Sequence, residues 1–385
     1  MTAKKAFGKI HLWLGLASGL IVFVVALSGS VLVFEEELEL LFRKKQLVVK
    51  EVLPQRKSMD ELSAAALNAY PGKKIKNIQV YHRPNRSVLF TMGSTKEERW
   101  VVAVDPYTAQ VLGALDYNKR FFTIMERLHR QLLMGKIGKA ITGVSCLVFI
   151  TLLISGLVIW WPKTRQAIRQ RFKIKWKAKF KRVNWDFHAV FGFYSFLILL
   201  VIAATGLVWS YPWVNKMIFV LADGKPREKN IIPNNVAAYA GQGVYEKIIT
   251  ETNRYYTYKG DISLFIPEVD SLGISVFKNN AEVALSNISS AIYFDRNSGD
   301  ILKARPYESE TKGMKIRRLI YPIHTGSAYG WPTKIVAFIV SLFAASLPVT
   351  GTLIWIGRLK KTKRKRKPVL RQVIPVREQL EEVVG

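Results

Sequence analysis

The sequence predicts a membrane α+β protein in which four transmembrane helices form two helix–domain–helix repeats, each with a small extracytoplasmic α+β domain. Three observations lead to this fold class: four long uncharged apolar blocks, basic segments that flank the blocks in alternation, and an internal repeat. Apolar residues make up 49% of the 385 residues. Because they are gathered into blocks rather than spread periodically along the chain, a large soluble core is disfavoured.

Each apolar block is long enough to cross a bilayer. The blocks hold 22 to 25 residues without Lys, Arg, Asp or Glu, whereas a hydrocarbon core of about 30 Å needs about 20 helical residues. The first block follows three lysines, as the apolar part of a signal peptide would, but it exceeds the roughly 7–15 apolar residues of such a segment, so we interpret it as a retained helix. The blocks are Leu12–Phe34, Ala140–Trp161, Phe187–Tyr211 and Ile335–Gly357.

The net charge of +30 is concentrated beside the blocks. Residues 1–10, 163–182 and 358–367 carry three, ten and eight Lys or Arg, and none of these segments has an acidic residue. They flank the blocks in alternation, so the positive-inside rule makes all three cytoplasmic. The charge thus reports membrane topology and requires no nucleic acid as a partner; lipid is the expected contact, with the middle loop lying on the anionic inner leaflet.

These boundaries divide the chain into eight segments. They are the N-terminus with the first transmembrane helix (1–34), an outer α+β domain (35–122), the second transmembrane helix with an outer extension (123–162), a basic cytoplasmic loop (163–183), the third transmembrane helix (184–211), a second outer α+β domain (212–320), the fourth transmembrane helix with an outer extension (321–357) and a basic cytoplasmic tail (358–385).

Both outer segments combine strand and helix signals. Residues 61–70 are expected to form a helix that follows a cap region at 58–60. Five stretches alternate or are continuously apolar over strand lengths: Ser87–Met92, Trp100–Val104, Ile262–Ile266, Ile274–Phe277 and Ala291–Phe294. The one cysteine, Cys146, lies in an apolar block, so neither outer domain can contain a disulfide.

The two halves of the chain repeat one another. His11 precedes Gly29 by 18 positions and His188 precedes Gly206 by 18, whereas His129 precedes Gly156 by 27 and His324 precedes Gly351 by 27. The strand and turn at 102–112 also align with 292–302. Because each copy crosses the membrane twice, the copies keep one orientation and are related about the membrane normal.

Four of the five histidines occupy these repeat positions. His11 and His188 begin helices that leave the cytoplasmic side, and His129 and His324 precede helices that enter from outside. The topology predicts one pair near the inner face and one near the outer face. Intramembrane ionisable residues are costly, which favours a functional role; the structural alternative is a set of ordinary interfacial residues. The fifth, His82, is interpreted as a surface loop residue.

Two bis-histidine sites are typical of haem that carries electrons, since both axial positions are filled. Metal ions without a porphyrin are an alternative, although two histidines per site with no nearby Cys, Asp or Glu make a small ligand set for zinc or non-haem iron. Small residues beside the helices would leave space for the porphyrin, although close helix packing uses the same residues. The candidates for this space are Gly29, Gly206, Gly156 and Gly351.

The chain resembles the PepSY-associated transmembrane proteins over nearly its whole length. The resemblance rests on motifs around the paired histidines and on the strand–turn segments at Asp105 and Asp295, which look like PepSY domain cores. In the first turn, Ala109 stands where the family usually has Gly. The histidine motifs are His11-x3-Gly15, Leu128-His129-Arg130, Ser155-Gly-Leu-Val-Ile-Trp-Trp-Pro162, Asp186-Phe-His-Ala-Val-Phe-Gly192 and Ile323-His-Thr-Gly326.

Some members of this family look like di-haem ferric-siderophore reductases of bacterial inner membranes. The resemblance therefore implies two haem b groups, one bound by His11 and His188 and the other by His129 and His324. Arg130 is a candidate contact for a haem propionate. No nucleophile–base arrangement or phosphate loop is present, so orientation and haem potential would be the protein's contribution.

The outer pair raises a geometric difficulty. His129 to Trp161 is 32 residues, about 48 Å if wholly helical, which exceeds the hydrocarbon thickness. The outer histidines must then lie at or above the membrane surface, or the helices must break near Gly135–Gly138 and Pro332.

The sequence thus leads to the hypothesis of an oxidoreductase of the bacterial inner membrane with both termini in the cytoplasm. Electrons from a cytoplasmic or quinol donor would reduce Fe(III) held by an outer siderophore, releasing Fe(II), which hard oxygen donors hold less tightly. Two alternatives remain at this point: a haem-free, membrane-anchored PepSY regulatory or binding protein, and a di-haem protein that donates electrons to a periplasmic protein.

Overall fold

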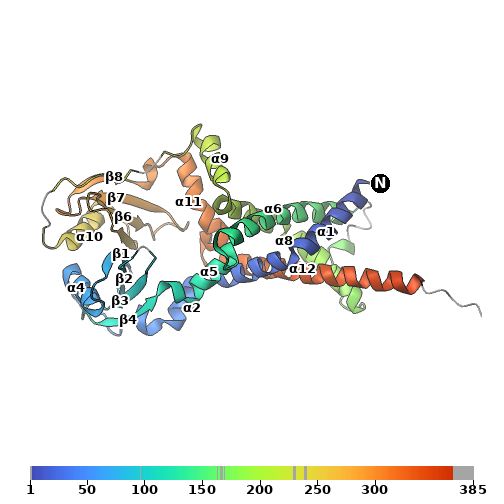
Figure 1. Ribbon diagram of the computed structural model, residues 1–385, viewed down its shortest axis with the longest axis horizontal. Helices are drawn as coiled ribbons and strands as arrows, with labels where there is room; N and C mark the ends of the chain where they lie inside the picture. Colours follow the sequence, from blue (N-terminus) through green and yellow to red (C-terminus); the bar gives the residue numbers. More distant parts are fainter. Residues whose placement is uncertain are drawn as a thin grey trace, which may run out of the picture.

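The structure is a computed structural model with a helical bundle at one end and a β-sheet at the other (Figure 1). It describes residues 2–95, 97–162, 164, 168, 170–228, 231–237 and 241–366, with side chains described as far as residue 360. Most of the predicted basic tail and parts of the predicted basic loop lie outside the described residues.

Four helices are long and apolar enough to span a membrane, as the sequence predicts. They are α1 (Ala3–Leu32), α6 (Gly135–Trp160), α8 (Phe180–Ser210) and α12 (Trp331–Arg366), of which the apolar span runs to Lys360. Helix α1 packs against α6 and α12, and α8 packs against the same two helices, so α1 and α8 face each other across the bundle. Small residues such as Ser18, Ser155 and Ser195 are buried between the helices, which permits close packing in a membrane.

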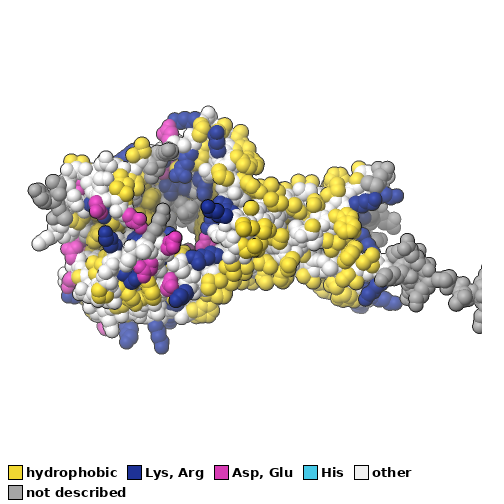
Figure 2. Space-filling view, viewed as in Figure 1, with side chains coloured by type: hydrophobic (Ala, Val, Ile, Leu, Met, Phe, Trp, Pro, Cys, Tyr) yellow, Lys and Arg dark blue, Asp and Glu magenta, His cyan; other side chains and the backbone are white. Residues whose placement is uncertain are grey.

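Both described ends of the chain lie at the end of the bundle farthest from the sheet (Figure 1). We call this the terminal end and the opposite one the sheet-side end. Figure 2 shows an apolar belt across the visible face of the bundle, with Lys and Arg side chains at the terminal end and more of them where the bundle meets the sheet. The four described spans are an even number, so both described ends lie on one side of the bundle. Both long connections between spans therefore lie at the sheet-side end.

Shorter helices connect the bundle to the sheet or cover the sheet. They are α2 (Glu35–Phe42), α3 (Lys44–Leu47), α4 (Met59–Ala69), α5 (Phe121–Gln131), α9 (Pro212–Asp223), α10 (Val244–Tyr255) and α11 (Lys312–Thr325). The predicted helix at 61–70 is α4. Ser58 caps it with a complete capping box, because its side chain accepts from the Glu61 backbone while the Glu61 carboxylate accepts from the Ser58 N–H.

The strands of both outer segments form one antiparallel sheet in the order β4-β3-β2-β1-β5-β6-β7-β8. Strands β1 and β5 join the two halves, with Ile78 opposite Leu264. The sequence predicts two separate outer domains and gives no signal that β1 of one half pairs with β5 of the other. The strands are β1 (Lys74–Val80), β2 (Val88–Gly93), β3 (Trp100–Val104), β4 (Val111–Asp116), β5 (Ile262–Phe265), β6 (Ile274–Asn279), β7 (Ser289–Phe294) and β8 (Ile301–Arg305).

The core of the sheet is continuous across this junction. Ile78, Phe90, Leu264 and Ile292 are fully buried in one hydrophobic cluster with residues of α4 and α10. The two helices are also linked directly, since the Met59 backbone N–H donates to the Glu246 carboxylate at 2.9 Å. The five predicted strands correspond to β2, β3, β5, β6 and β7, and the structure adds β1, β4 and β8.

Candidate functional site

Two helices outside the four spans carry the predicted outer histidines. His129 lies in the last turn of α5, and His324 lies in the last turn of α11. Each helix ends in left-handed backbone, at Leu132 (φ 49°) and at Gly326 (φ 76°), just before the next span begins. The breaks allow α5 to pack against α1 and α6, and α11 to pack against α8. The expected helix breaks are therefore present, and both histidines enter the bundle at its sheet-side end.

The outer histidines face each other. The ring centroids of His129 and His324 are 6.1 Å apart, with an interplanar angle of 63°. The edge of the Trp209 ring lies against His324, at a centroid distance of 5.2 Å. The predicted outer pair is therefore formed in the structure, and it takes one histidine from each half of the chain.

The inner histidines meet across the diagonal of the bundle. The centroids of His11 in α1 and His188 in α8 are 6.3 Å apart, with perpendicular rings. This pair also takes one member from each half. His82 lies apart from both pairs, in the exposed loop after β1 as expected, where its Nδ1 is 2.6 Å from the Asp261 carboxylate.

The outer rings each use Nδ1 for a hydrogen bond to backbone. Nδ1 of His129 is 2.8 Å from the Val25 carbonyl oxygen, and Nδ1 of His324 is 2.9 Å from the Ile202 carbonyl oxygen. Because a carbonyl oxygen can only accept, Nδ1–H is the donor in both rings. This tautomer leaves Nε2 with a free lone pair, as a metal ligand requires.

The inner rings use Nδ1 for hydrogen bonds to side-chain hydroxyl groups. Nδ1 of His11 is 2.9 Å from Ser155 Oγ, and Nδ1 of His188 is 2.9 Å from Thr350 Oγ1. The Ser155 hydroxyl donates its own proton to the Leu152 carbonyl oxygen. The Thr350 hydroxyl donates toward the Ser346 and Leu347 carbonyl oxygens, at 3.0 and 3.1 Å. The hydroxyls therefore accept from Nδ1–H, and Nε2 is again the free nitrogen.

A glycine lies directly beside each of the four rings. A Cβ on Gly29 would come within 2.9 Å of His129 Cε1, and a Cβ on Gly206 within 3.2 Å of His324 Cε1. Gly156 faces His11 at 3.2 Å, and Gly351 faces His188 at 3.3 Å. An imidazole therefore lies beside each glycine, and the expectation that these glycines leave space for a porphyrin stays a prediction.

A family model described as the PepSY-associated TM region matches residues 9–358. The match covers nearly the whole chain and includes all four paired histidines. The chain belongs to this family. No curated protein matches the sequence.

In this PepSY-associated membrane protein, the outer pair borders a cavity of about 500 Å³. All four spans contribute to its walls, together with α5 and α11, and Gly29 and Gly206 are among its lining residues. The volume falls within the range of about 300–1,000 Å³ for cofactor sites. Apolar side chains such as Val22, Phe149 and Leu199 form its deeper part, so the cavity combines an apolar interior with two convergent imidazoles.

The residues present fit a haem. Two imidazoles on opposite sides of one metal, with metal–nitrogen bonds of about 2 Å, have ring centroids about 6 Å apart, as both pairs have. Among the residues that the structure describes, no three His, Cys, Asp or Glu side chains converge as metal ligands.

Arg130 lies at the rim of the outer cavity. Its Nη1 donates to the Glu126 carboxylate at 2.6 Å, and the side chain is about half exposed. Lys139 lines the same cavity. The propionate contact expected of Arg130 stays a prediction.

Sequence reasoning missed the groups that orient the rings. Ser155, Thr205 and Thr350 were considered only as small residues, although Thr205 Oγ1 lies 3.1 Å from His324 Nδ1. The acceptors at Val25 and Ile202 are backbone carbonyl oxygens, so the residue types at these positions do not indicate this role in the sequence. The repeated Ser/Thr-Gly pair was the available signal, since its position relative to the histidines is the same in both halves.

Proposed function

We propose that this protein is a di-haem b reductase of the bacterial inner membrane that transfers electrons to ferric siderophore on the sheet side. The observation that carries the proposal is the presence of two imidazole pairs, each about 6 Å between centroids and each built from both halves of the chain. Nδ1 donates in all four rings, which leaves four Nε2 atoms as ligands. A haem-free regulator would have no use for this arrangement.

The pairs lie at opposite ends of the bundle. His11 and Gly29, the neighbour of His129, are both in α1 and are separated by 18 residues, or about 27 Å along the helix. This separation approaches the hydrocarbon thickness of about 30 Å. His11 and His188 would hold one haem and His129 and His324 the other. When bound, each haem would supply one-electron transfer without an open coordination position.

The distribution of cations supports cytoplasmic termini. Lys4, Lys5 and Lys9 lie at the start of α1, and Lys and Arg side chains gather at the terminal end (Figure 2), which the positive-inside rule assigns to the cytoplasm. A cytoplasmic reductant or a membrane quinol would donate electrons there, and the sheet would face the periplasm. The matching halves of the sheet would be two PepSY-like units of a duplicated chain.

A polar cleft beneath the sheet provides a place for the acceptor. It has a volume of about 430 Å³ and shares Tyr117, Glu126, Arg130 and Gln131 with the outer cavity. Arg99, Arg127 and Arg130 line the cleft against Glu97 and Glu126, which gives an excess of positive charge. An anionic ferric chelate would be attracted to it, and one electron would convert its Fe(III) to the less tightly held Fe(II).

An optical spectrum of the purified chain tests the cofactor. We expect a b-type signal in the reduced-minus-oxidised difference spectrum, and its absence after haem supplementation would contradict the proposal. His82→Ala is the matched control, since His82 is an exposed loop residue bonded to Asp261 beside the sheet and its loss should leave the signal unchanged.

Reoxidation tests the acceptor. The reduced protein is mixed anaerobically with ferric hydroxamate and catecholate siderophores, and the released Fe(II) is trapped by a coloured chelator. The gallium(III) complexes, which cannot accept an electron, serve as controls. We expect reoxidation by at least one ferric complex and by no gallium complex. Arg99→Gln and Arg127→Gln should raise KM without changing the spectrum. Reoxidation by none of the complexes would favour a protein acceptor instead.

A further inference from the structure

Helix α9 (Pro212–Asp223) lies outside the four spans yet is apolar on two faces. It follows directly after α8, with Pro212 in its first turn and Gly224 in left-handed conformation after its end. Its inner face is packed against protein, because Val214 and Phe219 are buried. A helix at a protein–water boundary would be polar on its remaining face.

The remaining face of α9 is apolar. Trp213 is 55% exposed and Leu221 is 78% exposed, and Met217 and Val220 lie between them on the same face. These residues recur at the spacing of one helical stripe. Lys216 is the one charged residue within this stretch of α9, and a lysine at such a position can extend its ammonium group toward headgroups.

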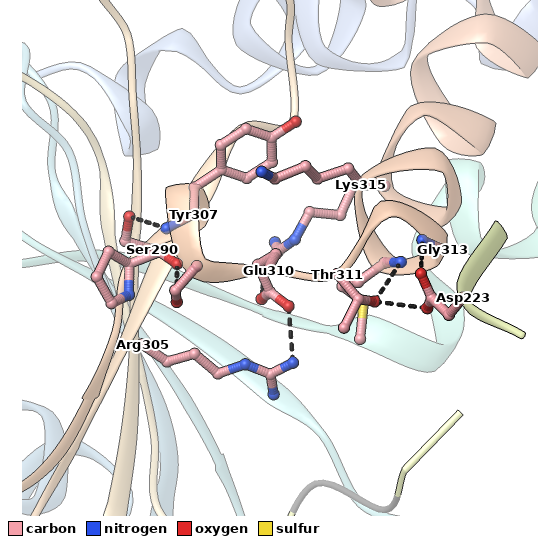
Figure 3. Close-up of polar contacts among 12 residues, drawn as sticks. Asp223, Ser290, Arg305, Tyr307, Glu310, Thr311, Gly313 and Lys315 are labelled. Carbon is pink, nitrogen blue, oxygen red and sulfur yellow. Dashed lines mark hydrogen bonds and ion pairs between the residues drawn. The ribbon is translucent and has the colours of Figure 1, made fainter. Parts of the chain in front are cut away.

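A set of polar contacts holds α9 to α11, the helix that carries His324 (Figure 3). The Asp223 carboxylate accepts from Thr311 Oγ1 at 2.7 Å and from the Gly313 backbone N–H at 2.8 Å. Arg317 Nε donates to Asn215 Oδ1 at 2.9 Å. Phe219 and Asp223 occupy the space in which a Cβ on Gly313 would lie. The inner face therefore packs against α11. The apolar outer face is exposed, and among the described residues its one ring contact is that of Trp213 with Tyr211 in the preceding turn, at 6.2 Å between centroids.

The position of α9 indicates what covers that face. The helix lies beside α11 at the sheet-side end of the bundle (Figure 1), and its apolar surface is continuous with the apolar belt of the spans (Figure 2). Lys225 and Arg227 follow immediately after the helix. An apolar helix face flanked by cations at the edge of a membrane-spanning bundle matches the chemistry of a lipid interface, with acyl chains below and anionic headgroups beside it.

We propose that α9 is an interfacial helix whose Trp213–Leu221 face is immersed in the lipid of the sheet-side leaflet. Through Asp223 and Asn215 it fixes the depth of α11 relative to the bilayer surface. This inference rests on the exposed face of α9 and its contacts with α11, and it holds whether or not the histidines bind haem.

Site-directed spin labelling tests the inference. Single cysteines replace Trp213, Met217 or Leu221 in a Cys146→Ala background, and the labelled full-length protein is placed in nanodiscs that contain one copy each. Leu67→Cys is the matched control, because Leu67 is an exposed apolar residue on α4, a helix on the far side of the sheet from the bundle (Figure 1). Collision rates are measured with molecular oxygen, which enters lipid, and with a water-soluble nickel chelate.

We expect the ratio of oxygen to nickel collisions at 217 and 221 to exceed that at 67 several-fold, with 213 in between because it begins the helix. Equal ratios at all four positions would overturn the proposal. Protection in crowded liposomes that is lost in single-copy nanodiscs would also overturn it, because a second copy of the chain would then cover the face. The optical spectrum, measured on the same samples, tests haem separately.

Discussion

The imidazole of His129 lies against Gly29 and donates to the carbonyl oxygen of Val25, four residues earlier in α1. A glycine at this position removes the side chain that would cover the preceding turn of the helix. The ring can then approach the helix backbone closely enough to donate a hydrogen bond to the Val25 carbonyl oxygen. The same relationship recurs at Gly206 with His324, so a glycine determines where each outer imidazole can lie.

Gly29→Ala should displace His129. A Cβ would be 2.9 Å from a buried ring atom, closer than non-bonded carbon atoms approach without repulsion, and the break before α6 limits how far α5 can retreat. We expect loss of about half the bound haem, measured by the pyridine haemochrome absorbance per protein. Gly15→Ala is the control on the same helix, since its Cβ would make an ordinary 3.8 Å contact with Leu152. Full occupancy in Gly29→Ala would contradict the role of this glycine.

His129→Ala should remove the outer haem and leave the inner one. The two pairs share no ligand, and each requires both of its members. His188→Ala should give the opposite result, with the outer haem retained. Redox titration of each variant would then show one midpoint potential in place of two. Retention of two haems by either variant would refute the pairing.

Ala109→Gly should stabilise the sheet. Ala109 and Gly299 occupy equivalent turns after Asp105 and Asp295, with φ of 59° and 70°. A left-handed alanine costs roughly 1–2 kcal/mol, which exceeds the roughly 0.5–1 kcal/mol entropic cost of glycine. We therefore expect a gain of up to about 1 kcal/mol in the free energy of unfolding. Gly299→Ala is the reciprocal variant and should lower the Tm of the sheet, as followed by near-ultraviolet circular dichroism.

Asp295 should make the sheet sensitive to acid. Burial opposes ionisation of its carboxylate, but backbone N–H donors from Ala237, Ser298, Val236 and Asn297 outweigh burial and lower its pKa to about 2, from 3.8. Because the folded pKa is depressed, the stabilisation is complete above about pH 4 and is lost as the pH falls toward 2.

The measurement is the Tm of the sheet between pH 6 and pH 2.5, compared with Asp295→Asn. We expect the difference between the two proteins to shrink as the pH falls. A constant difference across this range would show that the Asp295 charge does not contribute to stability.

The sequence predicted the elements whose formation depends only on residues that are close together in the chain. Helix propensity at 61–70 and the cap region at 58–60 predicted α4 with its start two residues late, because propensity and caps depend only on residues within a few positions. The difference between Ala109 and the glycine usual at its position was also visible, and the structure shows that the left-handed turn is kept there with a Cβ. Strand β1 was missed because Lys74–Val80 mixes polar residues with apolar ones, and its pairing with β5 depends on a segment that lies far away in the chain.

The sequence by itself determined the four spans, the placement of both described ends of the chain on one side and the matched positions of four histidines, because hydrophobic length, charge and spacing are read along a single chain. Only the tertiary structure decided that each glycine lies beside an imidazole, that the Nδ1 atoms donate to Val25, Ile202, Ser155 and Thr350, and that both outer segments share one sheet. These features are contacts between residues that are distant in sequence, and packing alone brings them within bonding distance.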